Sequence, residues 1–256
     1  MTRHTPQAVA DSLQQAERVL FITGAGLSAD SGLPTYRGTG GLYNDADTAD
    51  GVPIEVALSG EMLARHPEIT WKYLAQIEHN CRGAVPNPGH EVIAAIERHV
   101  RHALVFTQNI DGFHARAGSR NVIEIHGNLY ALQCTRCSHA QQVESYGEIA
   151  IPPICPRCGS LVRPRVVLFG ERLDVELIAR LEFEMNSGFD LVFSVGTSSV
   201  FPYIVEPVLW AAEAGIPTVE INPGNTAISE IVDCHLRMGA ADAMTAIWSA
   251  LPERSP

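Results

Sequence analysis

The chain has 256 residues, of which 46% are hydrophobic and 18% charged, and its formal net charge is −11. This length and composition support a large buried core and exclude an intrinsically disordered chain. The acidic balance argues against a nucleic-acid-binding surface, because phosphate contacts need clustered basic residues and the chain has only 18 lysines and arginines. An acidic surface suits positively charged partners such as lysine-rich protein segments, although solubility explains it equally well.

The N-terminus lacks the basic and then apolar pattern of a secretory leader, and no apolar run has the length of a membrane span. We therefore expect a cytoplasmic protein with no membrane partner and no nucleic acid bound. Cys81 and Cys234 fit that compartment as isolated, buried thiols. No feature of the sequence decides between a monomer and an oligomer.

Apolar, β-branched runs alternate with helical patterns along the chain. Strands are expected at residues 19–23, 103–107, 122–125, 191–195 and 218–221, and helices at 9–16, 68–81, 91–100, 175–185 and 204–214. The pattern predicts an α/β fold with a Rossmann-like doubly wound parallel sheet. In such sheets ligands bind beyond the carboxyl ends of the strands.

The first strand is followed by Gly24-Ala25-Gly26-Leu27-Ser28-Ala29, a Gly-x-Gly-x-x-Ala variant of the dinucleotide-binding loop. In a dehydrogenase this loop opens a helix that leads to a second strand ending in Asp or Glu. Here Pro34 and the glycines between 32 and 41 rule out such a continuation. Hydride transfer is thus disfavoured, and a long glycine-rich loop suits closure over a bound dinucleotide.

Two Cys-x-x-Cys pairs interrupt the alternation, at Cys134 and Cys137 and at Cys155 and Cys158. This spacing is typical of a tetrahedral zinc site. Four thiolates leave no open coordination position, so we expect a structural rather than a catalytic ion. The chemistry must then lie at the strand ends, where Gln108-Asn109-Ile110-Asp111, His126-Gly127, Gly196-Thr197-Ser198-Ser199 and Asn222-Pro223-Gly224 follow four of the strands.

Taken in order, these motifs resemble those of the sirtuins, the NAD-dependent protein lysine deacylases. The motifs are Gly-Ala-Gly-Leu-Ser (24–28), Gly-Leu-Pro-Thr-Tyr-Arg (32–37), Gln-Asn-Ile-Asp (108–111), Ile-His-Gly (125–127), the cysteine pairs, Val-Val-Leu-Phe-Gly-Glu (166–171), Gly-Thr-Ser-Ser (196–199) and Ile-Asn-Pro-Gly (221–224). The resemblance spans residues 15–245. It implies three parts: an NAD-binding domain (1–33, 86–130 and 164–256), a cofactor-binding loop with a small helical module (34–85) and a small zinc-binding module (131–163).

The resemblance also implies the reaction. The acyl oxygen of an acylated lysine attacks C1′ of the nicotinamide ribose, nicotinamide leaves, and a ribose hydroxyl then attacks the acyl carbon. His126 matches the general base of the family. By the same resemblance NAD is held by Gly24, Ala25, Gly26, Ser28, Ala29, Thr35, Tyr36, Arg37, Gln108, Asn109, Ile110, Asp111, Gly196, Thr197, Ser198, Asn222, Pro223, Gly224 and Ala240.

Acylated lysine of a protein is the implied partner, bound as an extended strand between residues 166–171 and 199–202. Val167, Phe169, Gly170, Glu171 and Val200 are the residues implied there, although composition favours a core strand at 166–169 almost as well. His114 is interpreted as structural.

Two positions depart from the family pattern. In the family type that accepts acidic acyl groups, a Tyr-x-x-Arg pair recognises the carboxylate. Here the tyrosine is Tyr73, but Gln76 stands in the place of the arginine. A neutral amide cannot pair with a carboxylate as arginine does. We therefore expect a deacetylase, with desuccinylation or demalonylation as the alternative if Arg65 or Arg82 reaches the pocket. Tyr36 stands where the family has Phe, which leaves altered NAD hydrolysis open.

Three other functions remain as alternatives. An NAD-dependent protein ADP-ribosyltransferase shares the glycosidic cleavage but modifies a protein. A zinc-dependent nucleic-acid-binding module is disfavoured by the charge, and a dehydrogenase by the loop after the first strand.

Overall fold

The computed structural model describes residues 4–35 and 48–252. A six-stranded parallel sheet forms the larger part, in the order β3-β2-β1-β7-β8-β9. Its strands are β1 (Arg18–Thr23), β2 (His102–Thr107), β3 (Val122–Glu124), β7 (Leu191–Val195), β8 (Thr218–Ile221) and β9 (Cys234–Leu236). The strand order reverses direction between β1 and β7, which confirms the expected doubly wound arrangement.

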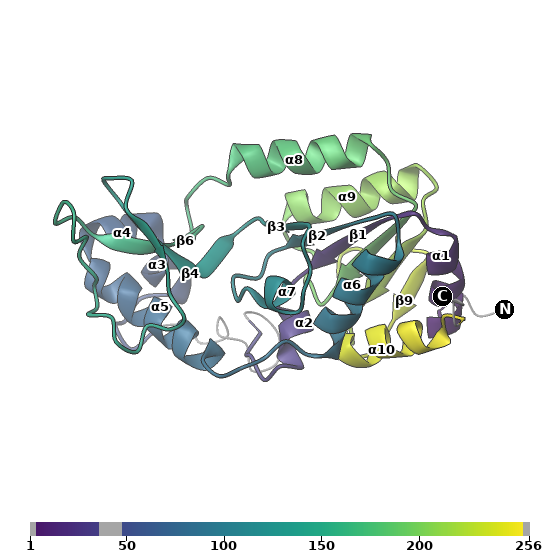
Figure 1. Cartoon of the computed structure of the whole chain (residues 1–256), viewed down its shortest axis with the longest axis horizontal. Coiled ribbons are helices and arrows are strands. Elements are labelled where there is room, and N and C mark those ends of the chain that lie inside the picture. The colour runs from purple at the N-terminus through teal and green to yellow at the C-terminus, as the bar shows by residue number, and fades with distance from the viewer. Residues whose placement is uncertain (1–3, 36–47, 253–256) are drawn as a thin grey trace.

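Helices cover both faces of this sheet (Figure 1). One layer contains α1 (Pro6–Gln15), α6 (Pro88–His99) and α10 (Ala240–Ala250), and the other contains α8 (Val175–Asn186) and α9 (Pro202–Glu213). The predicted strands and helices of this part are confirmed to within a few residues. β9 and α10 were not predicted, because β9 has only three residues and α10 carries apolar residues on several sides.

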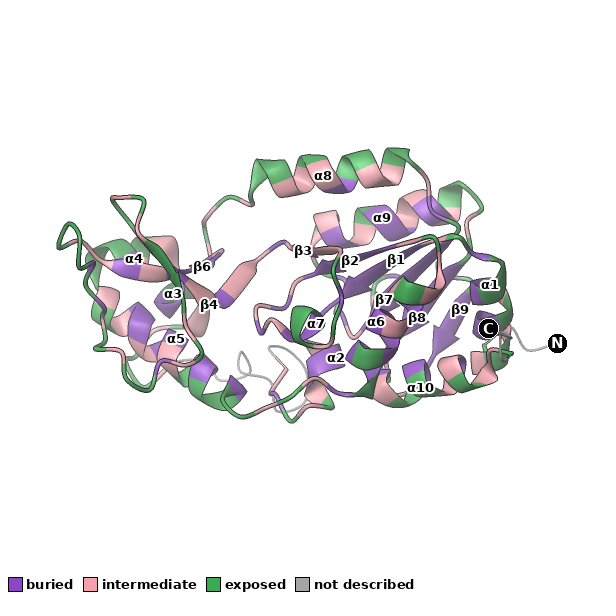
Figure 2. Ribbon diagram, viewed as in Figure 1, coloured by how far each residue is buried: buried purple, intermediate pink, exposed green. Residues whose placement is uncertain are grey.

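Alternation along each strand sends its side chains to the two layers. In β1, Val19 and Phe21 pack with α1, α6 and α10, whereas Leu20 and Ile22 pack with α8 and α9. The strands are accordingly almost wholly buried (Figure 2). Burial on both faces explains why these segments are continuously apolar rather than alternating.

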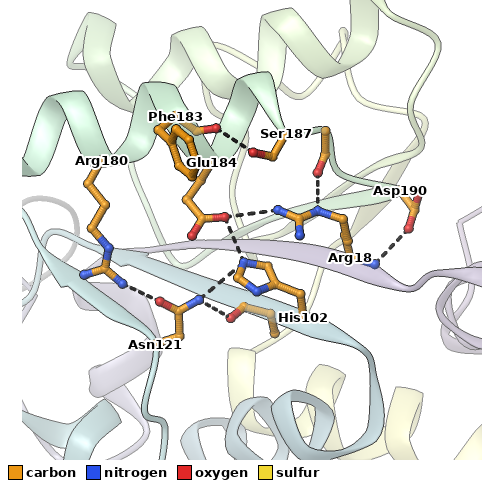
Figure 3. A network of polar contacts seen from close by, with 10 residues as sticks. Arg18, His102, Asn121, Arg180, Phe183, Glu184, Ser187 and Asp190 are labelled. Carbon is orange, nitrogen blue, oxygen red and sulfur yellow. Dashed lines mark hydrogen bonds and ion pairs between the residues drawn. The ribbon is translucent and has the colours of Figure 1, made fainter.

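A polar network connects α8 to the amino ends of β1, β2 and β3 (Figure 3). Glu184 accepts a hydrogen bond from Arg18 at 3.1 Å and lies 2.9 Å from Nε2 of His102. Arg180 donates to the carbonyl of Val122 and to the side chain of Asn121. The network lies at the end of the sheet opposite the polar strand ends, so it supports the fold rather than a site.

The smaller part has a three-stranded antiparallel sheet in the order β5-β4-β6, made of β4 (Gly127–Cys134), β5 (Ala140–Gln142) and β6 (Val162–Val166). Three helices pack beside it: α3 (Ile54–Ala57), α4 (Gly60–Arg65) and α5 (Pro67–Cys81). One core joins them, because Trp71, Leu74 and Ile77 of α5 pack in the same cluster as Leu132 and Val162. Trp71 also donates to the carbonyl of Val162 at 3.0 Å.

The described residues also include two short helices, α2 (Ala25–Ala29) after β1 and α7 (Phe113–Arg116) after β2. α2 ends well before Pro34, as the sequence predicts. Every helix in the described ranges is too short or too polar to span a bilayer.

Candidate functional site

The loops after β1 and β7 touch through their glycines. Gly26 N donates to Gly196 O at 2.7 Å, and Gly196 has a φ of +62°. A Cβ on Gly26 would lie 2.7 Å from Gly196 Cα, and one on Gly196 would lie 2.3 Å from Leu27 N. Only glycine allows this approach, which brings the turn that begins α2 directly against the loop after β7. A close-packed glycine turn at the start of a helix is typical of dinucleotide-binding loops.

A buried polar network joins α2 to the segment after β2. Ser28 Oγ donates to Asp111 Oδ2 at 2.7 Å, and Asn109 Nδ2 donates to Gly24 O at 3.0 Å and contacts Ser28 Oγ at 3.1 Å. Burial raises the pKa of Asp111, and hydrogen bonds from Phe113 N and Ser28 oppose that rise. The network fixes the carboxylate and the amide at one wall of a cavity.

The empty space in and above that cavity, open solvent included, is about 410 Å³. Five of the residues predicted to hold NAD line it, and five lining residues escaped prediction. The lining residues are Ala25, Ser28, Asn109, Ile110 and Asp111, and Leu33, Pro34, Ile77, Asn80 and Cys81. The second set comes from the end of the α2 loop and from α5, where the sequence carries no signal of which face turns inward.

His126 follows β3 and points both ring nitrogens at partners. Nδ1 lies 3.0 Å from the carbonyl oxygen of Gln108, and Nε2 lies 2.7 Å from the hydroxyl of Tyr203. A carbonyl only accepts, so Nδ1 carries the proton and Nε2 presents a lone pair. Burial lowers the pKa of His126, and the Gln108 carbonyl opposes that shift. The arrangement gives a neutral imidazole that can accept a proton at Nε2.

Gln108 ties this histidine to the loop after β7. Its side-chain amide donates to Thr197 Oγ1 at 2.8 Å, and Thr197 O accepts from Asn222 Nδ2 at 3.0 Å. Gly224 N in turn donates to Asn222 Oδ1 at 3.0 Å. The ends of β2, β7 and β8 thus share one hydrogen-bonded edge.

The remaining predicted cofactor residues differ in exposure. Ser198, Pro223 and Gly224 are exposed, Ala29 and Thr35 are half-buried, and Ala240 is buried at the start of α10. Tyr36 and Arg37 lie outside the described residues. His114, interpreted as structural, is buried with Nε2 at 2.9 Å from Thr23 Oγ1.

The segment after β6 is held on both sides. Val167 N donates to His126 O at 2.9 Å, and Phe169 N donates to Leu58 O at 3.0 Å. The regular strand ends at Val166, while Leu168 is buried and Gly170 is exposed. The segment therefore runs from the predicted base to α4.

Two of the predicted substrate residues differ sharply in accessibility. Glu171 is bound by Arg163 at 2.5 Å and by Leu168 N at 2.9 Å, so its carboxylate is engaged within its own segment. Val200, in the facing loop, is 54% exposed.

Tyr73 and Gln76 lie one turn apart on α5 and neither lines the cavity. Tyr73 is buried and donates to Asp50 Oδ2 at 2.5 Å, whereas Gln76 is exposed. Arg65 pairs with Glu61 and Arg82 with Glu78. The two arginines named as alternatives for binding an acidic acyl group are thus already paired.

The four predicted cysteines converge. Their Sγ atoms all lie within 4.8 Å of one another, with 3.5 Å between Cys134 and Cys158 and 3.6 Å between Cys137 and Cys155. Ideal tetrahedral zinc with Zn–S bonds of about 2.3 Å has sulfurs about 3.8 Å apart. Backbone N–H groups of Arg136 and Cys137 point at Cys134 Sγ. The donor set fits one structural zinc ion.

The contact of Tyr203 with His126 is also not predictable from the sequence. Tyr203 follows the predicted loop directly, but nothing in the sequence indicates that its hydroxyl reaches a histidine 77 residues away.

Comparisons with known proteins agree on one family. The model of the Sir2 family matches residues 24–202. A curated relative, "NAD-dependent protein deacylase 2" of Pseudomonas aeruginosa, is 52% identical over 253 residues, covering 97% of this chain and 98% of its own length.

Solved structures give the same result. A Sir2 homologue in complex with NAD aligns with a TM-score of 0.85 and 34% identity, covering 97% of this chain and 96% of that one. A Sir2 structure containing a deacetylated p53 peptide and 3′-O-acetyl ADP-ribose aligns with a TM-score of 0.84 and 28% identity, covering 97% of this chain and 100% of that one.

Proposed function

This chain belongs to the Sir2 family and is an NAD-dependent protein deacylase, and we propose that it removes neutral acyl groups, acetyl above all, from protein lysines with His126 as general base. NAD supplies an electrophilic ribose carbon, with nicotinamide as the leaving group. The acyl-lysine substrate class follows from a related structure that holds a deacetylated peptide with acetyl ADP-ribose.

The observation that carries the role of His126 is its protonation pattern. Nδ1 is committed to the Gln108 carbonyl at 3.0 Å, which leaves Nε2 as the proton acceptor. Burial, by lowering the pKa of the imidazole, keeps that acceptor unprotonated at neutral pH. The cysteine cluster has no role in this step, because four thiolates would close the coordination shell of the zinc ion.

The NAD-binding role rests on the residues that surround the cavity. Asn109 and Asp111 carry the amide and carboxylate that suit a carboxamide and ribose hydroxyls, and Gln108 belongs to the same edge. The loop of Gly24, Ala25 and Gly26 packs directly on the loop after β7, and in this scheme it would lie beside the pyrophosphate. The outer residues Ser198, Asn222 and Ala240 would serve the adenosine half. In this scheme, residues 1–33, 86–130 and 164–256 form the NAD-binding domain, segment 34–85 supplies the cofactor-binding loop and a helical module, and segment 131–163 is the zinc-binding module.

The acyl preference follows from charges near α5. Tyr73 already donates to a carboxylate, that of Asp50, and Lys72 pairs with the same oxygen at 2.7 Å. Arg65 and Arg82 are paired as well. An acidic acyl group near α5 would therefore find no unpaired cation among these residues, whereas a neutral acyl group needs none.

The test is a panel of peptides carrying acetyl-, succinyl- or malonyl-lysine, incubated with NAD and analysed by mass spectrometry. We expect deacetylation to be fastest, with one O-acetyl-ADP-ribose and one nicotinamide per lysine. Replacement of His126 by Ala should lower turnover by about 10² or more, while replacement of the exposed His66 by Ala should change little. Faster desuccinylation would refute the acyl preference, and an ADP-ribosylated peptide would favour the transferase.

A cytoplasmic location is part of the same proposal. Cys81 and Cys234 are buried, unpaired thiols, and the four clustered cysteines must stay reduced to bind zinc. The acidic charge of −11 also argues against nucleic acid as a partner. Fractionation of cells and measurement of binding to DNA at low salt test these two points.

A further inference from the structure

Tyr203 occupies the ring nitrogen that a general base needs free. Its hydroxyl lies 2.7 Å from Nε2 of His126. Because Nδ1 is protonated and bound to the Gln108 carbonyl, Nε2 has only a lone pair and Tyr203 must be the donor. Without substrate, the lone pair is therefore engaged by a phenol.

Local structure builds this contact from a short segment. Ser199 is buried and has a φ of 52°, which turns the chain sharply after the loop that follows β7. Phe201 then stacks on Tyr203 with ring centroids 5.5 Å apart and an interplanar angle of 17°. Both rings lie nearly perpendicular to the imidazole of His126, with ring centroids 6.3 Å away for Phe201 and 6.0 Å away for Tyr203. The orientation of the phenol is thus fixed by stacking as well as by its hydrogen bond.

The phenol also has the right protonation state. Burial raises the pKa of Tyr203 to about 12, so its hydroxyl keeps a proton to donate throughout the neutral range. The side chain is only half-buried and its neighbour Pro202 is exposed. When the bond to Nε2 breaks, the hydroxyl can turn toward water and does not remain buried and unpaired.

We propose that Tyr203 is a positioning residue of the deacylase, which engages Nε2 of His126 until the reacting hydroxyl of the substrate takes its place. The proposal rests on the proposed role of His126 as the base. In the exchange, the Tyr203 O–H···Nε2 hydrogen bond breaks and a substrate O–H···Nε2 hydrogen bond forms. No covalent bond changes until the substrate hydroxyl gives up its proton to Nε2.

This exchange has a consequence for ligand selection. A ligand that brings a hydroxyl to Nε2 replaces one hydrogen bond by another. A ligand without a hydroxyl at that point either leaves Tyr203 in place or leaves Nε2 unpaired. Sites built around a hydroxyl discriminate strongly in this way.

The direct test is Tyr203→Phe. The variant lacks the hydroxyl that bonds His126 Nε2, so the substrate does not have to break that bond. We expect kcat/KM for NAD to rise about two- to tenfold, measured with acetylated peptide at a pH where His126 is neutral. In ¹⁵N NMR spectra of the substrate-free protein, the Nε2 resonance of His126 should move toward the position of a free lone pair. An unchanged or lower kcat/KM, or an unmoved Nε2 resonance, overturns the proposal.

Tyr146→Phe is the matched control, because it removes a tyrosine hydroxyl that bonds Leu129 O in the smaller part of the molecule. It should leave the His126 resonance unchanged. If Tyr203→Phe fails to fold, the wild-type protein supplies the second readout. NAD should shift the Nε2 resonance, and an NAD analogue without hydroxyls on its nicotinamide ribose should not; the reverse pattern overturns the proposal.

The two proposals fail in different ways. A His126→Ala variant that keeps its activity refutes the base itself. An inactive His126→Ala together with a Tyr203→Phe variant that shows no gain refutes only the role of Tyr203.

Discussion

Ser28 donates a hydrogen bond of 2.7 Å to Asp111, although 83 residues separate the two in the chain. The bond connects the loop after β1 to the segment after β2 and aims the carboxylate at the cavity. Because both residues are buried, the carboxylate depends on this donor and on Phe113 N rather than on water.

Replacement of Ser28 by Ala should weaken NAD binding. A hydrogen bond to a charged group contributes about 1.5–3 kcal/mol, so we expect the Kd for NAD to rise by roughly ten- to a hundredfold. Calorimetric titration measures it. Ser12→Ala is the control, since Ser12 bonds Ala8 O within α1 and should leave the Kd unchanged. Equal affinities of wild type and Ser28→Ala would contradict the role given to this bond.

Replacement of Gly26 by Ala should cost both stability and cofactor binding. The added methyl group would meet Gly196 Cα at 2.7 Å, and backbone on both sides leaves no flexible group to give way. Overpacking of this kind costs about 1–3 kcal/mol, measurable by urea unfolding. At Gly147 the atoms nearest to an added methyl group would belong to the side chains of Arg82 and Ser145, at 3.5 Å or more. Gly147→Ala should therefore unfold like wild type, and a similar result for Gly26→Ala would argue against a tight loop contact.

Removal of zinc should abolish deacylation by loosening the smaller part of the molecule. Cys134 and Cys155 belong to the core shared with α5, so the ion supports the same cluster that positions one wall of the cavity. Cys137→Ser should lower the zinc content below one ion per chain and reduce activity with it. Cys234→Ala, which alters a buried thiol outside the cluster, should retain one zinc ion. Full activity after verified loss of the metal would show that the ion is dispensable.

Stability should fall in mild acid because of His90. Burial lowers the pKa of His90 from 6.5 to about 4. The unfolded chain therefore binds a proton that the folded chain does not between these values, and stability is complete above pH 6.5 and declines as the pH falls toward 4. We expect the free energy of unfolding at pH 5 to be about 2 kcal/mol lower than at pH 7 from this group alone.

Urea unfolding at the two pH values measures that difference. In wild type, His90 Nδ1 accepts a hydrogen bond from the backbone N–H of Asn87. The glutamine of His90→Gln can still accept that bond, but it does not take up a proton in mild acid. The variant should lose less stability between pH 7 and pH 5 than wild type. An equal loss would assign the acid sensitivity to other groups.

Most strands of the main sheet and the zinc ligands could be predicted from the sequence, because each depends on residues that are close together in the chain. Buried parallel strands need unbroken apolar runs, and a four-thiolate site needs two closely spaced cysteine pairs. β9 is too short to give such a signal, and α10 carries apolar residues on too many sides to be bounded from the sequence.

The candidate site likewise contains residues that the sequence predicts and residues that only the fold brings together. The order of motifs was sufficient to identify the family and to name Asn109, Asp111 and His126. It gave no sign of Ile77, Asn80 and Cys81 at the cavity, because only packing decides which face of α5 turns toward α2. It also left Tyr73 and Gln76 as a pair, although one is buried against Asp50 and the other is exposed.

The sequence by itself determined the parallel sheet, the glycine loop, the metal ligands and the polar residues at the strand ends, because each depends on neighbours a few positions apart. Only the tertiary structure decided that Gly26 meets Gly196, that Ser28 holds Asp111 and that Tyr203 covers Nε2 of His126. These contacts join segments from different strands, and their distances are set by how the sheet and its helices pack. Local sequence patterns do not predict that packing.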